Sequence, residues 1–476
     1  MSALDVLVVG GGISGLTTAF HLSHGSNAGN AGNTGLRVAL LEASPRVGGA
    51  LETWSDGSDG SDGSNGSDTP WRFELGPNTV LENHESVGRL IREAGLEDEK
   101  ITALPTAKKR FLWKGDRLHP LPSGPLGFLR TPLFPASAKL RLLREPWIPR
   151  PAGNPDENEE SIAAFVRRRL GQDFLDYAVG PFVSGVYAGD PERLSTRHAV
   201  PKIAALEREH GSLIRGAFAR RKGPAPGGAM ISFRDGLERL PRELGRQIDA
   251  RTSVACRRIV PVEGGFRVET DSGAVEAKRV VMAVPADVAA RLLEDATEGR
   301  SRGFADIAYA AVAVVSTGWR REDVAHPLGG FGFLVPRKEK LRLLGVLFPS
   351  EIFPGRAPEG HVALTAIVGG RTDPEAAGWD EERLLSEVLG EMRRTLGVRG
   401  EPVVRVIRRW PRAIPQYEMG HGRFLELART IESSLPGLRI GGNFLRGVSV
   451  PDCIRNATAM AGEILLQESQ ERQERG

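Results

Sequence analysis

The residues best suited to chemistry stand near the start of the chain, where glycines are spaced G-x-G-x-x-G directly after the apolar run Val6–Val9. Such a turn lets the backbone approach a pyrophosphate, and the helix that follows, expected over about residues 14–24, points its positive end at the phosphates. The spacing alone does not say which dinucleotide binds, because NAD, NADP and FAD share the same ADP half. The predicted contacts are Gly10, Gly12, Ile13, Ser14 and Gly15.

A second apolar run, Leu36–Leu41, predicts the neighbouring buried strand, and it ends at Glu42. A carboxylate at this point can accept hydrogen bonds from both ribose hydroxyls of an ADP moiety, and it would repel a 2′-phosphate, which disfavours NADP. The adjoining Ala43 is a further expected contact. The interval from Gly15 to Glu42 is longer than usual because it contains residues 24–35, whose glycines and asparagines predict a flexible surface loop.

Arg46, Gly48 and Gly49 complete the pattern E-x-x-x-R-x-G-G that begins at Glu42. Paired glycines let backbone N–H groups close on a second phosphate or on a flavin, and the arginine adds positive charge beside the pyrophosphate. The pattern resembles the fingerprint of the FAD-dependent amine oxidase and phytoene desaturase superfamily, and the resemblance implies that the cofactor is FAD. No cysteine or histidine stands in a recognised flavin-tethering motif, so we expect FAD to bind without a covalent link.

The same resemblance assigns three further segments to the cofactor. The stretch "FELGPN" lies by the flavin in the superfamily, and the backbone near residue 254 would meet the adenine ring. Residues 438–465 predict a strand, a glycine pair, a short loop and a helix whose N-terminus would face the isoalloxazine ring and favour negative charge on the reduced flavin. The implied contacts are Gly76, Pro77, Asn78, Val254, Gly442, Asn443, Val448, Ser449 and Val450.

Longer stretches, residues 110–134, 182–201, 329–339 and 447–453, resemble the oxygen-dependent protoporphyrinogen oxidase family. The resemblance implies an α/β and α+β fold with three parts. These are a discontinuous Rossmann-like FAD-binding domain, a β-rich substrate-binding domain and an α-helical membrane-binding domain. The expected boundaries are 1–89, 229–300 and 431–476 for the FAD-binding domain, 301–430 for the substrate domain and 90–228 for the helical domain.

The resemblance also implies the reaction, which is oxidation of protoporphyrinogen IX to protoporphyrin IX in heme biosynthesis. Six electrons leave in three hydride transfers to the flavin, O2 is the acceptor and H2O2 the product, so the flavin supplies the chemistry and no acid or base is assigned. Carried over by motif, Arg110 would pair with a propionate and Gly185 would leave room for the macrocycle. Phe331 and Leu334 would hold a pyrrole ring between them, with Ile367 nearby where many relatives carry methionine. Core packing is the alternative interpretation of these three apolar residues.

Three alternatives stay open. A coproporphyrinogen III oxidase, acting on the intermediate with four carboxylates, is hard to separate from the sequence alone. An amine oxidase of the same superfamily is disfavoured, because the expected strand Gly303–Trp319 has no lysine and the chain has only four tyrosines. An escort or GDP-dissociation-inhibitor protein without flavin turnover is disfavoured by the intact "PRVGG" and the C-terminal glycine segment.

Composition bears on partners and location. The net charge of +3 gives no reason to expect nucleic-acid binding. Residues 101–150, however, hold ten basic and two acidic residues. We therefore expect this segment to bind the surface of an anionic membrane, with apolar side chains entering it. Those expected are Phe128, Leu129, Leu133, Phe134, Leu140, Leu142, Leu143 and Trp147.

The rest of the composition fits a chain in a reducing compartment. Only two cysteines occur, so a disulfide framework and a metal site are not expected, and Cys256 is expected to be a packed thiol. No run is apolar enough to span a membrane, and Ile307–Trp319 predicts a buried strand instead. We expect a homodimer in the cytoplasm, attached peripherally to the inner face of the cell membrane. The repeat Ser55–Asp68 predicts the tip of a hairpin, without the spacing of a calcium loop.

Overall fold

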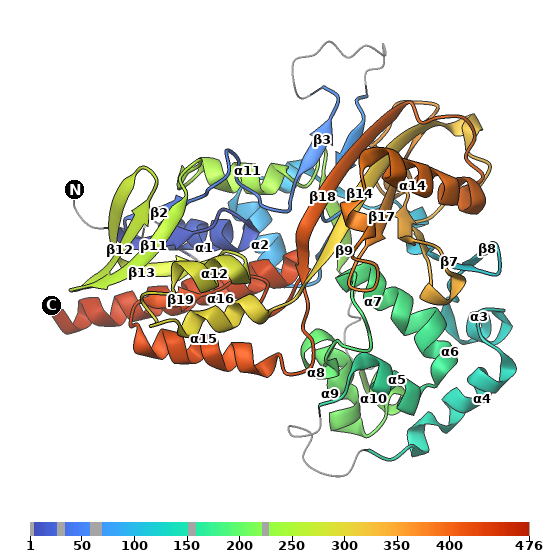
Figure 1. The fold of residues 1–476 in the computed structure, drawn as a ribbon, viewed down its shortest axis with the longest axis horizontal. Coiled ribbons are helices and arrows are strands. Elements are labelled where there is room, and N and C mark those ends of the chain that lie inside the picture. Colours follow the sequence, from blue (N-terminus) through green and yellow to red (C-terminus); the bar gives the residue numbers. More distant parts are fainter. Residues whose placement is uncertain (1–3, 26–33, 58–68, 151–158, 221–227, 476) are drawn as a thin grey trace.

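The computed structural model describes residues 4–25, 34–57, 69–150, 159–220 and 228–475. Most of the two low-complexity stretches, residues 26–33 and 58–68, lies outside the described residues. Two sheets dominate the molecule and stand beside each other, and a group of short helices lies below the second sheet (Figure 1). Both ends of the chain lie at the far side of the first sheet, away from those helices.

The first sheet has the strand order β10-β2-β1-β13-β12-β11. The pairs among β10, β2, β1 and β13 are parallel, whereas β12 is antiparallel to both of its neighbours. The last three residues of β13 also pair in parallel with β19, so strands from near both ends of the chain lie in one sheet. The bounds are β1 (Leu4–Val9), β2 (Val38–Leu41), β10 (Asp249–Arg251), β11 (Cys256–Val262), β12 (Gly265–Thr270), β13 (Gly273–Met282) and β19 (Leu438–Ile440).

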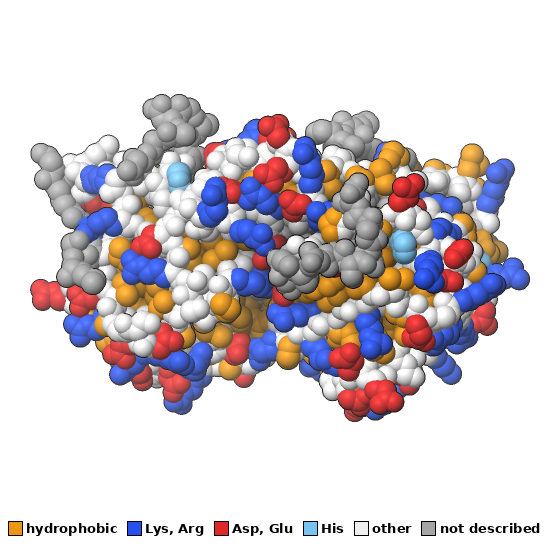
Figure 2. All heavy atoms as spheres, turned by 90° about the horizontal axis from the view of Figure 1, so that it is seen from above, with side chains coloured by type: hydrophobic (Ala, Val, Ile, Leu, Met, Phe, Trp, Pro, Cys, Tyr) orange, Lys and Arg blue, Asp and Glu red, His pale blue; other side chains and the backbone are white. Residues whose placement is uncertain are grey.

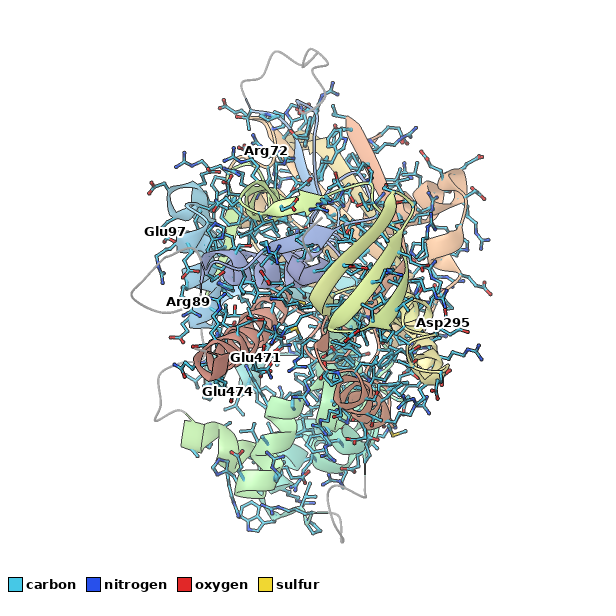
Figure 3. All side chains as sticks on the ribbon, turned by 90° about the vertical axis from the view of Figure 1, so that its left-hand side faces the viewer. Arg72, Arg89, Glu97, Asp295, Glu471 and Glu474 are labelled. Carbon is cyan, nitrogen blue, oxygen red and sulfur yellow. The ribbon has the colours of Figure 1, made fainter. Side chains whose placement is uncertain are left out.

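Helices cover both faces of this sheet, which explains why residues 6–9 of β1 are continuously apolar. Val6 and Val8 pack in a cluster with residues of α1 and α16, whereas Leu7 and Val9 pack in a cluster with residues of α12 and α15. The helices are α1 (Ile13–His24), α2 (Glu85–Glu93), α11 (Arg239–Arg246), α12 (Ala286–Leu292), α15 (Gly422–Ser434) and α16 (Val450–Arg475). Seen from the side of this sheet, Arg89 and Glu97 lie at one edge of the molecule (Figure 3).

The second sheet has the order β18-β14-β17-β16-β15-β7-β8. Its pairs are antiparallel except for β15 and β7. Helix α14 (Glu381–Leu396) covers one face, where Ala313 and Val315 pack with Leu384 and Val388. The strands are β7 (Phe111–Lys114), β8 (Arg117–Pro120), β14 (Tyr309–Arg320), β15 (Gly332–Leu334), β16 (Leu343–Leu347), β17 (His361–Gly369) and β18 (Val404–Pro415).

Smaller elements join the two sheets. The pair β3 and β4 forms the expected hairpin, and β5, β9 and β6 form a three-stranded sheet. Their bounds are β3 (Thr53–Ser55), β4 (Arg72–Glu74), β5 (Val80–Glu82), β6 (Lys100–Thr102) and β9 (Ala229–Phe233). Short helices are η1 (Glu97–Glu99), η2 (Pro105–Lys108), η5 (Arg300–Asp306), η6 (Arg321–Asp323), η7 (Arg337–Glu339), η8 (Ala376–Gly378) and α13 (Pro349–Ile352).

Three predicted boundaries differ from the structure. The strand expected from Gly303 begins at Tyr309, because residues 300–306 form the 3-10 helix η5. The strand expected from Leu36 begins at Val38. Residues 111–120, placed in the helical segment by the sequence, form β7 and β8 and extend the second sheet through the pairing of β7 with β15.

The group of helices below the second sheet runs from α3 to α10. It is held by a buried ion network in which Arg169 contacts both Glu145 and Glu207. Glu145 also accepts hydrogen bonds from the backbone of Leu213 and Ile214 at the start of α10. The bounds are α3 (Gly124–Arg130), α4 (Ala136–Arg144), η3 (Glu145–Trp147), α5 (Ile162–Arg169), α6 (Gln172–Phe174), η4 (Leu175–Val179), α7 (Gly180–Tyr187), α8 (Thr196–Ala199), α9 (Pro201–His210) and α10 (Leu213–Arg220).

The apolar residues expected at a membrane divide into two sets. Leu133 and Phe134 are buried in the core of the helical group, so their predicted exposure is wrong; Phe134 stacks on Phe174. Phe128 and Leu142 are partly buried against the same core. The others are exposed, and Trp147 shows 76% of its surface. Among the described residues, no helix is long and apolar enough to cross a membrane.

Candidate functional site

The glycine turn after β1 is tied to the carboxylate at the end of β2. Oε2 of Glu42 accepts from the backbone N–H of Gly11 at 2.6 Å, and Oε1 accepts from the N–H and hydroxyl of Ser44, each at 2.8 Å. A Cβ added to Gly11 would stand 2.9 Å from Cβ of Glu42. The sequence analysis missed Gly11, although the run of three glycines was the signal that could have found it.

Backbone N–H groups at the start of α1 lack hydrogen-bond partners in the described part of the chain. The N–H groups of Gly12, Ser14 and Gly15 have no acceptor among the described residues, whereas the parallel bridge between Gly12 and Gly48 engages that of Ile13. A Cβ added to Gly12 would meet nothing within 4 Å, whereas one added to Gly15 would collide with the carbonyl of Gly10. The open side of the turn therefore lies at Gly12, next to the free donors. This arrangement fits a bound phosphate.

The loop with the paired glycines closes over this turn. The N–H of Gly48 donates to the carbonyl of Gly11, and a Cβ on Gly49 would lie 3.3 Å from Cα of Gly12. A Cβ on Gly76 would lie only 2.0 Å from the carbonyl oxygen of Ala50, so the "GPN" stretch packs directly on the loop. Asn78 donates to the carbonyl of Gly76 and fixes that turn, which also contains Pro77.

Arg46 supports the loop from within. Its guanidinium donates to the carbonyls of Val47, Gly49 and Leu51 and to the carboxylate of Glu52 at 2.8 Å. Glu52 also pairs with Arg408 of β18 at 3.0 Å, so this loop is connected to the second sheet. In the structure Arg46 shapes the backbone, and its charge beside a pyrophosphate stays a prediction.

Val254 lies beside the backbone of Glu42. Its N–H donates to the carbonyl of Glu42 at 3.0 Å, and the N–H of Ser253 donates to the carbonyl of Ser44. Ala43 is exposed between them, so the three segments expected at the ADP moiety do meet. Cys256 follows in β11, where burial raises the pKa of its thiol to about 11, as expected of a packed cysteine.

The loop between β19 and α16 has its carbonyls fixed by side chains. The Tyr417 hydroxyl donates to Asn443 O, His421 Nε2 donates to Leu445 O at 3.0 Å, and Asn456 Nδ2 donates to Arg446 O at 2.8 Å. The thiol of Cys453 lies 3.8 Å from Gly447 O. Four carbonyls of this short loop therefore point inward, toward side chains of the surrounding protein.

Most N–H groups of the same loop have no hydrogen-bond partner within the described residues. Apart from the donor that closes the turn over residues 443–445, no N–H from Gly442 to Val450 has an acceptor within the described part of the chain. Ser449 caps α16, since its hydroxyl bonds the Asp452 carboxylate at 2.6 Å and accepts from the Asp452 N–H. A Cβ on Gly442 would be 3.4 Å from the carbonyl of Val284, which places the loop beside the end of β13 and close to Gly10. Val448 packs against the helical core. The donors fit a group that gains negative charge.

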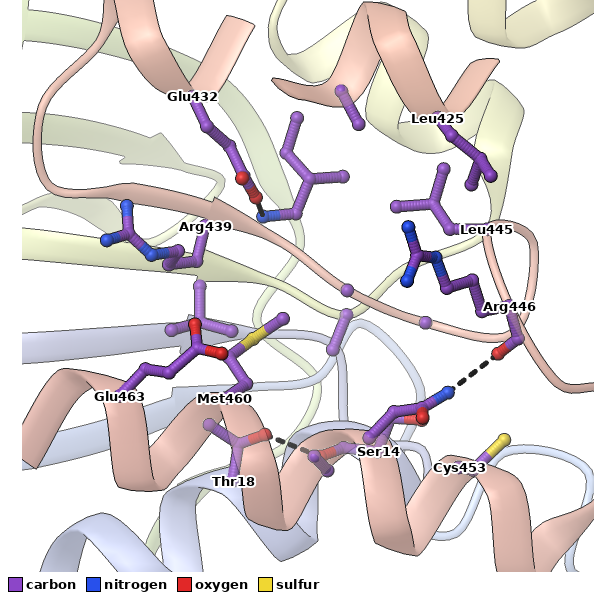
Figure 4. Close-up of a pocket in the computed structure, with 18 of the residues that line it drawn as sticks. Ser14, Thr18, Leu425, Glu432, Arg439, Leu445, Arg446, Cys453, Met460 and Glu463 are labelled. Carbon is purple, nitrogen blue, oxygen red and sulfur yellow. Dashed lines mark hydrogen bonds between the residues drawn. The ribbon is translucent and has the colours of Figure 1, made fainter. Parts of the chain in front are cut away.

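A cavity of about 330 Å3 lies on another side of this loop, between α15, β19 and α16 (Figure 4). Gly442 and Ser14 line it, so it reaches the predicted cofactor segments. Its other walls include Leu425, Met460 and Arg446, and the Arg446 side chain points into it. The Glu432 carboxylate in its wall accepts from the N–H of Ile440, and burial raises the pKa of this carboxyl.

The predicted substrate residues fall into two groups. Cζ of Arg110 lies 5.1 Å from the centre of the Phe331 ring, and Met230 adjoins both of them. Leu334 packs instead in the cluster of the helical group, where a Cβ on Gly185 of α7 would be 3.0 Å from its Cδ2. The structure does not bring Phe331 and Leu334 into one cluster, and their hold on a single ring stays a prediction.

Leu334 and Ile367 share a row across the second sheet. Leu334 pairs with Gly345 and Gly345 pairs with Ile367, so both side chains project from one face on either side of a glycine. Ile367 packs with Val312 and Ala188, which follows Gly185 at the end of α7. The result is an apolar platform that faces away from α14. Met230 was missed by the sequence analysis, because nothing local to it signals its contact with residues 110 and 331.

Electrostatics of the visible surface are mixed. From above, Lys and Arg alternate with Asp and Glu over both sheets, without one large patch of a single sign on this face (Figure 2). Among the described residues, no group of three or more His, Cys, Asp or Glu is arranged to hold a metal ion.

Comparisons with known proteins agree with this geometry. A model of the family described as flavin containing amine oxidoreductase matches residues 13–465. Protoporphyrinogen oxidase 1 of Arabidopsis thaliana chloroplasts is 33% identical over 97% of this chain and 88% of its own. Coproporphyrinogen III oxidase of Bacillus subtilis is 27% identical over 97% of both. A crystal structure from Exiguobacterium sp. 255-15 has a TM-score of 0.79 and 25% identity, and covers 98% of this chain and 100% of its own.

Proposed function

The chain belongs to the flavin-containing amine oxidoreductase family and is an FAD-dependent oxidoreductase, and from this premise we propose that it oxidises protoporphyrinogen IX to protoporphyrin IX. The similarity to protoporphyrinogen oxidases over almost the whole chain supports the proposal. The observation that carries it is the apolar platform of Leu334 and Ile367. Gly345 lies between these two residues and has no side chain, and α7 borders the platform. Such a surface suits a flexible, apolar macrocycle.

The chain's own residues bind and orient the reactants. The unpaired N–H groups within residues 12–15 and 442–450 would hold the pyrophosphate and the flavin. Glu42 would bind the ribose through lone pairs that Gly11 and Ser44 leave unused. When bound, FAD supplies the site's redox chemistry by accepting two electrons and a proton in each turnover. Arg110 would orient the ring by a bidentate pair with one propionate. We propose that FAD binds without a covalent link.

The remaining steps are proposed from the same resemblance. Removal of six electrons requires three turnovers of the cofactor for each ring, with O2 as acceptor and H2O2 as product. The apolar platform supports this assignment, because it would exclude water from the reacting carbon while the same ring is turned over repeatedly.

We also propose that the helical group docks on a membrane surface. Exposed leucines and a tryptophan on α3, α4 and η3 support this, with Lys139, Arg141 and Arg144 between them. The exposed apolar residues are Leu126, Leu129, Leu140, Leu143 and Trp147. A cytoplasmic location at the inner face of the cell membrane and a homodimer are part of the same proposal. No nucleic-acid partner is proposed.

Coproporphyrinogen III is the second candidate substrate, because the Bacillus subtilis relative carries that activity in its name. The deciding experiment is turnover of both porphyrinogens by the purified holoenzyme, followed by porphyrin fluorescence and H2O2 release. We expect the larger kcat/KM for the dicarboxylate. A larger kcat/KM for the tetracarboxylate would reverse the assignment, and no turnover of either would refute it.

A further inference from the structure

Two of the side chains that hold the loop before α16 come from another part of the molecule. Tyr417 and His421 lie between β18 of the second sheet and α15, and each is 1% exposed. They donate hydrogen bonds to the carbonyls of Asn443 and Leu445, and their rings pack together with centres 4.4 Å apart. The position of the loop is therefore set by residues that follow β18 of the second sheet.

The same two rings contact the helical group. The Tyr187 ring of α7 lies 6.0 Å from that of Tyr417, and the His198 ring of α8 lies 5.3 Å from that of His421. Gln416 strengthens the contact by donating to the carbonyl of Tyr187 at 2.9 Å. Tyr187 stands two residues after Gly185 on the helix that borders the apolar platform. A continuous set of buried contacts thus joins that helix to the loop.

We propose that Tyr417 and His421 are positioning residues that hold the carbonyls of the 442–450 loop inward, keep its N–H groups directed at the flavin and thereby set the reduction potential of bound FAD. The proposal rests on the assignment of this loop to the flavin in the proposed function. Backbone N–H dipoles stabilise negative charge, which increases when a flavin is reduced. An amide that rotates away would stabilise the reduced form less.

Tyr187 provides a matched control for the contact between Tyr417 and the loop. The Tyr187 hydroxyl donates to the carbonyl of Ala199 at 2.7 Å and does not touch the loop, whereas the hydroxyl of Tyr417 does. Both tyrosines are at least 95% buried. Tyr417→Phe and Tyr187→Phe therefore each remove one buried hydroxyl and leave a carbonyl unpaired, and only the first frees the loop.

The experiment measures the potential of the purified holoenzyme against a reference dye, without substrate. Tyr417→Phe should retain FAD. The equilibrium constant for reduction of the bound flavin should fall about tenfold, which is a shift of about 30 mV to a more negative potential for a two-electron couple. Amide hydrogen exchange of residues 443–450 should become faster. Tyr187→Phe should leave both quantities at the wild-type values. An unchanged potential and unchanged exchange in Tyr417→Phe would overturn the proposal.

His421 provides an independent test with rescue. His421→Phe keeps a ring but loses the donor to Leu445, so it should shift the potential in the same direction. His421→Gln restores an N–H donor and should bring the potential back toward the wild type. Equal potentials in these two variants would overturn the role of His421. Because no porphyrinogen is used, failure here is distinct from failure of the proposed substrate, which the turnover assay judges on the wild type alone.

Discussion

The backbone N–H of Gly11 lies 2.6 Å from Oε2 of Glu42, so the turn that would bind the pyrophosphate and the carboxylate that would bind the ribose form one hydrogen-bonded unit. The other oxygen of Glu42 is held by Ser44. The carboxylate is thereby oriented before any ligand arrives, which lowers the entropic cost of binding. Glu42 would therefore have two roles, since it shapes the glycine turn and its remaining lone pairs would accept from the ribose.

Glu42→Ala should release FAD. The change removes the charge-assisted bonds to the turn and to the ribose, each of about 1.5–3 kcal/mol, so the dissociation constant of FAD should rise at least tenfold. The measurement is flavin absorbance of the purified protein and fluorescence titration of the apoprotein with FAD. Glu276→Ala, in the exposed pair with Arg267 on β12–β13, is the control and should retain FAD fully. Full retention in Glu42→Ala would contradict the assignment.

Gly185→Ala should weaken substrate binding without weakening the fold. The new Cβ would stand 3.0 Å from Cδ2 of Leu334, so that side chain must move into the space above the platform. Alanine favours the helix by up to about 1 kcal/mol, which keeps the protein stable. We expect KM for the porphyrinogen to rise several-fold with an unchanged melting temperature.

The control for that change is Gly390→Ala in α14, where an added Cβ meets nothing within 4 Å. It provides the same helix preference without the contact, so KM should not change. An unchanged KM in Gly185→Ala as well would remove α7 from the substrate site.

The segments that we assign to the cofactor site could be singled out from the sequence because their signals are local. Val6–Val9 is apolar at every position since both faces of the first sheet are covered, and the glycines mark close approaches of backbone to backbone. The contacts of Tyr417 and His421 with the loop before α16 have no such signal. They join residues 24 and 26 positions apart in the chain, and only the packing of two sheets on one helical group brings them together.

In the helical group, the sequence alone does not distinguish apolar residues of the core from those exposed at the surface. Leu133 and Phe134 carry the same composition signal as Leu140 and Leu143, yet the first pair fills the core and the second pair faces outward. Segment α4 is short, so helical periodicity cannot assign the residues that precede it. For the same reason the pairing of β7 with β15 was not foreseen, since strand partners distant in sequence leave no local pattern.

Membrane binding should depend on the exposed set. Leu143→Asp with Trp147→Asp should lower the affinity for vesicles containing anionic phospholipid at least tenfold, because each buried apolar side chain contributes about 1.5–3 kcal/mol. Co-sedimentation measures this, and high salt should weaken binding of the wild type further. Leu466→Asp, equally exposed but on α16, is the control and should bind as the wild type does. Equal binding by the double variant would refute the assignment of this surface.

Stability should fall on acidification, in part through His421. Burial lowers the pKa of this imidazole to about 4 from an ordinary 6.5, so the fold favours the neutral form. Well above pH 6.5 the imidazole is neutral in both the folded and the unfolded state and does not reduce stability. As the pH falls toward 4, protonation favours the unfolded state, and the loss of stability is about 2 kcal/mol at pH 5. His421→Gln should therefore lose less stability than the wild type between pH 7 and pH 5, as measured by denaturant unfolding.

His210→Gln at the end of α9 is the comparison, because that histidine is partly exposed beside Glu209. Its variant should follow the pH dependence of the wild type. If His421→Gln and the wild type lose equal stability over this interval, His421 is not held neutral by the fold.

Arg110→Ala should affect the substrate and spare the flavin. The guanidinium lies over Phe331 at the edge of the second sheet and forms no ion pair within the described residues, so its charge is available to a propionate. Losing a charged hydrogen bond costs about 1.5–3 kcal/mol, which predicts a rise in KM for protoporphyrinogen IX of one to two orders of magnitude. The flavin spectrum should not change. Arg117→Ala, an exposed arginine on the neighbouring β8, is the matched control and should keep the wild-type KM. If both variants show the same KM as the wild type, the propionate is held elsewhere.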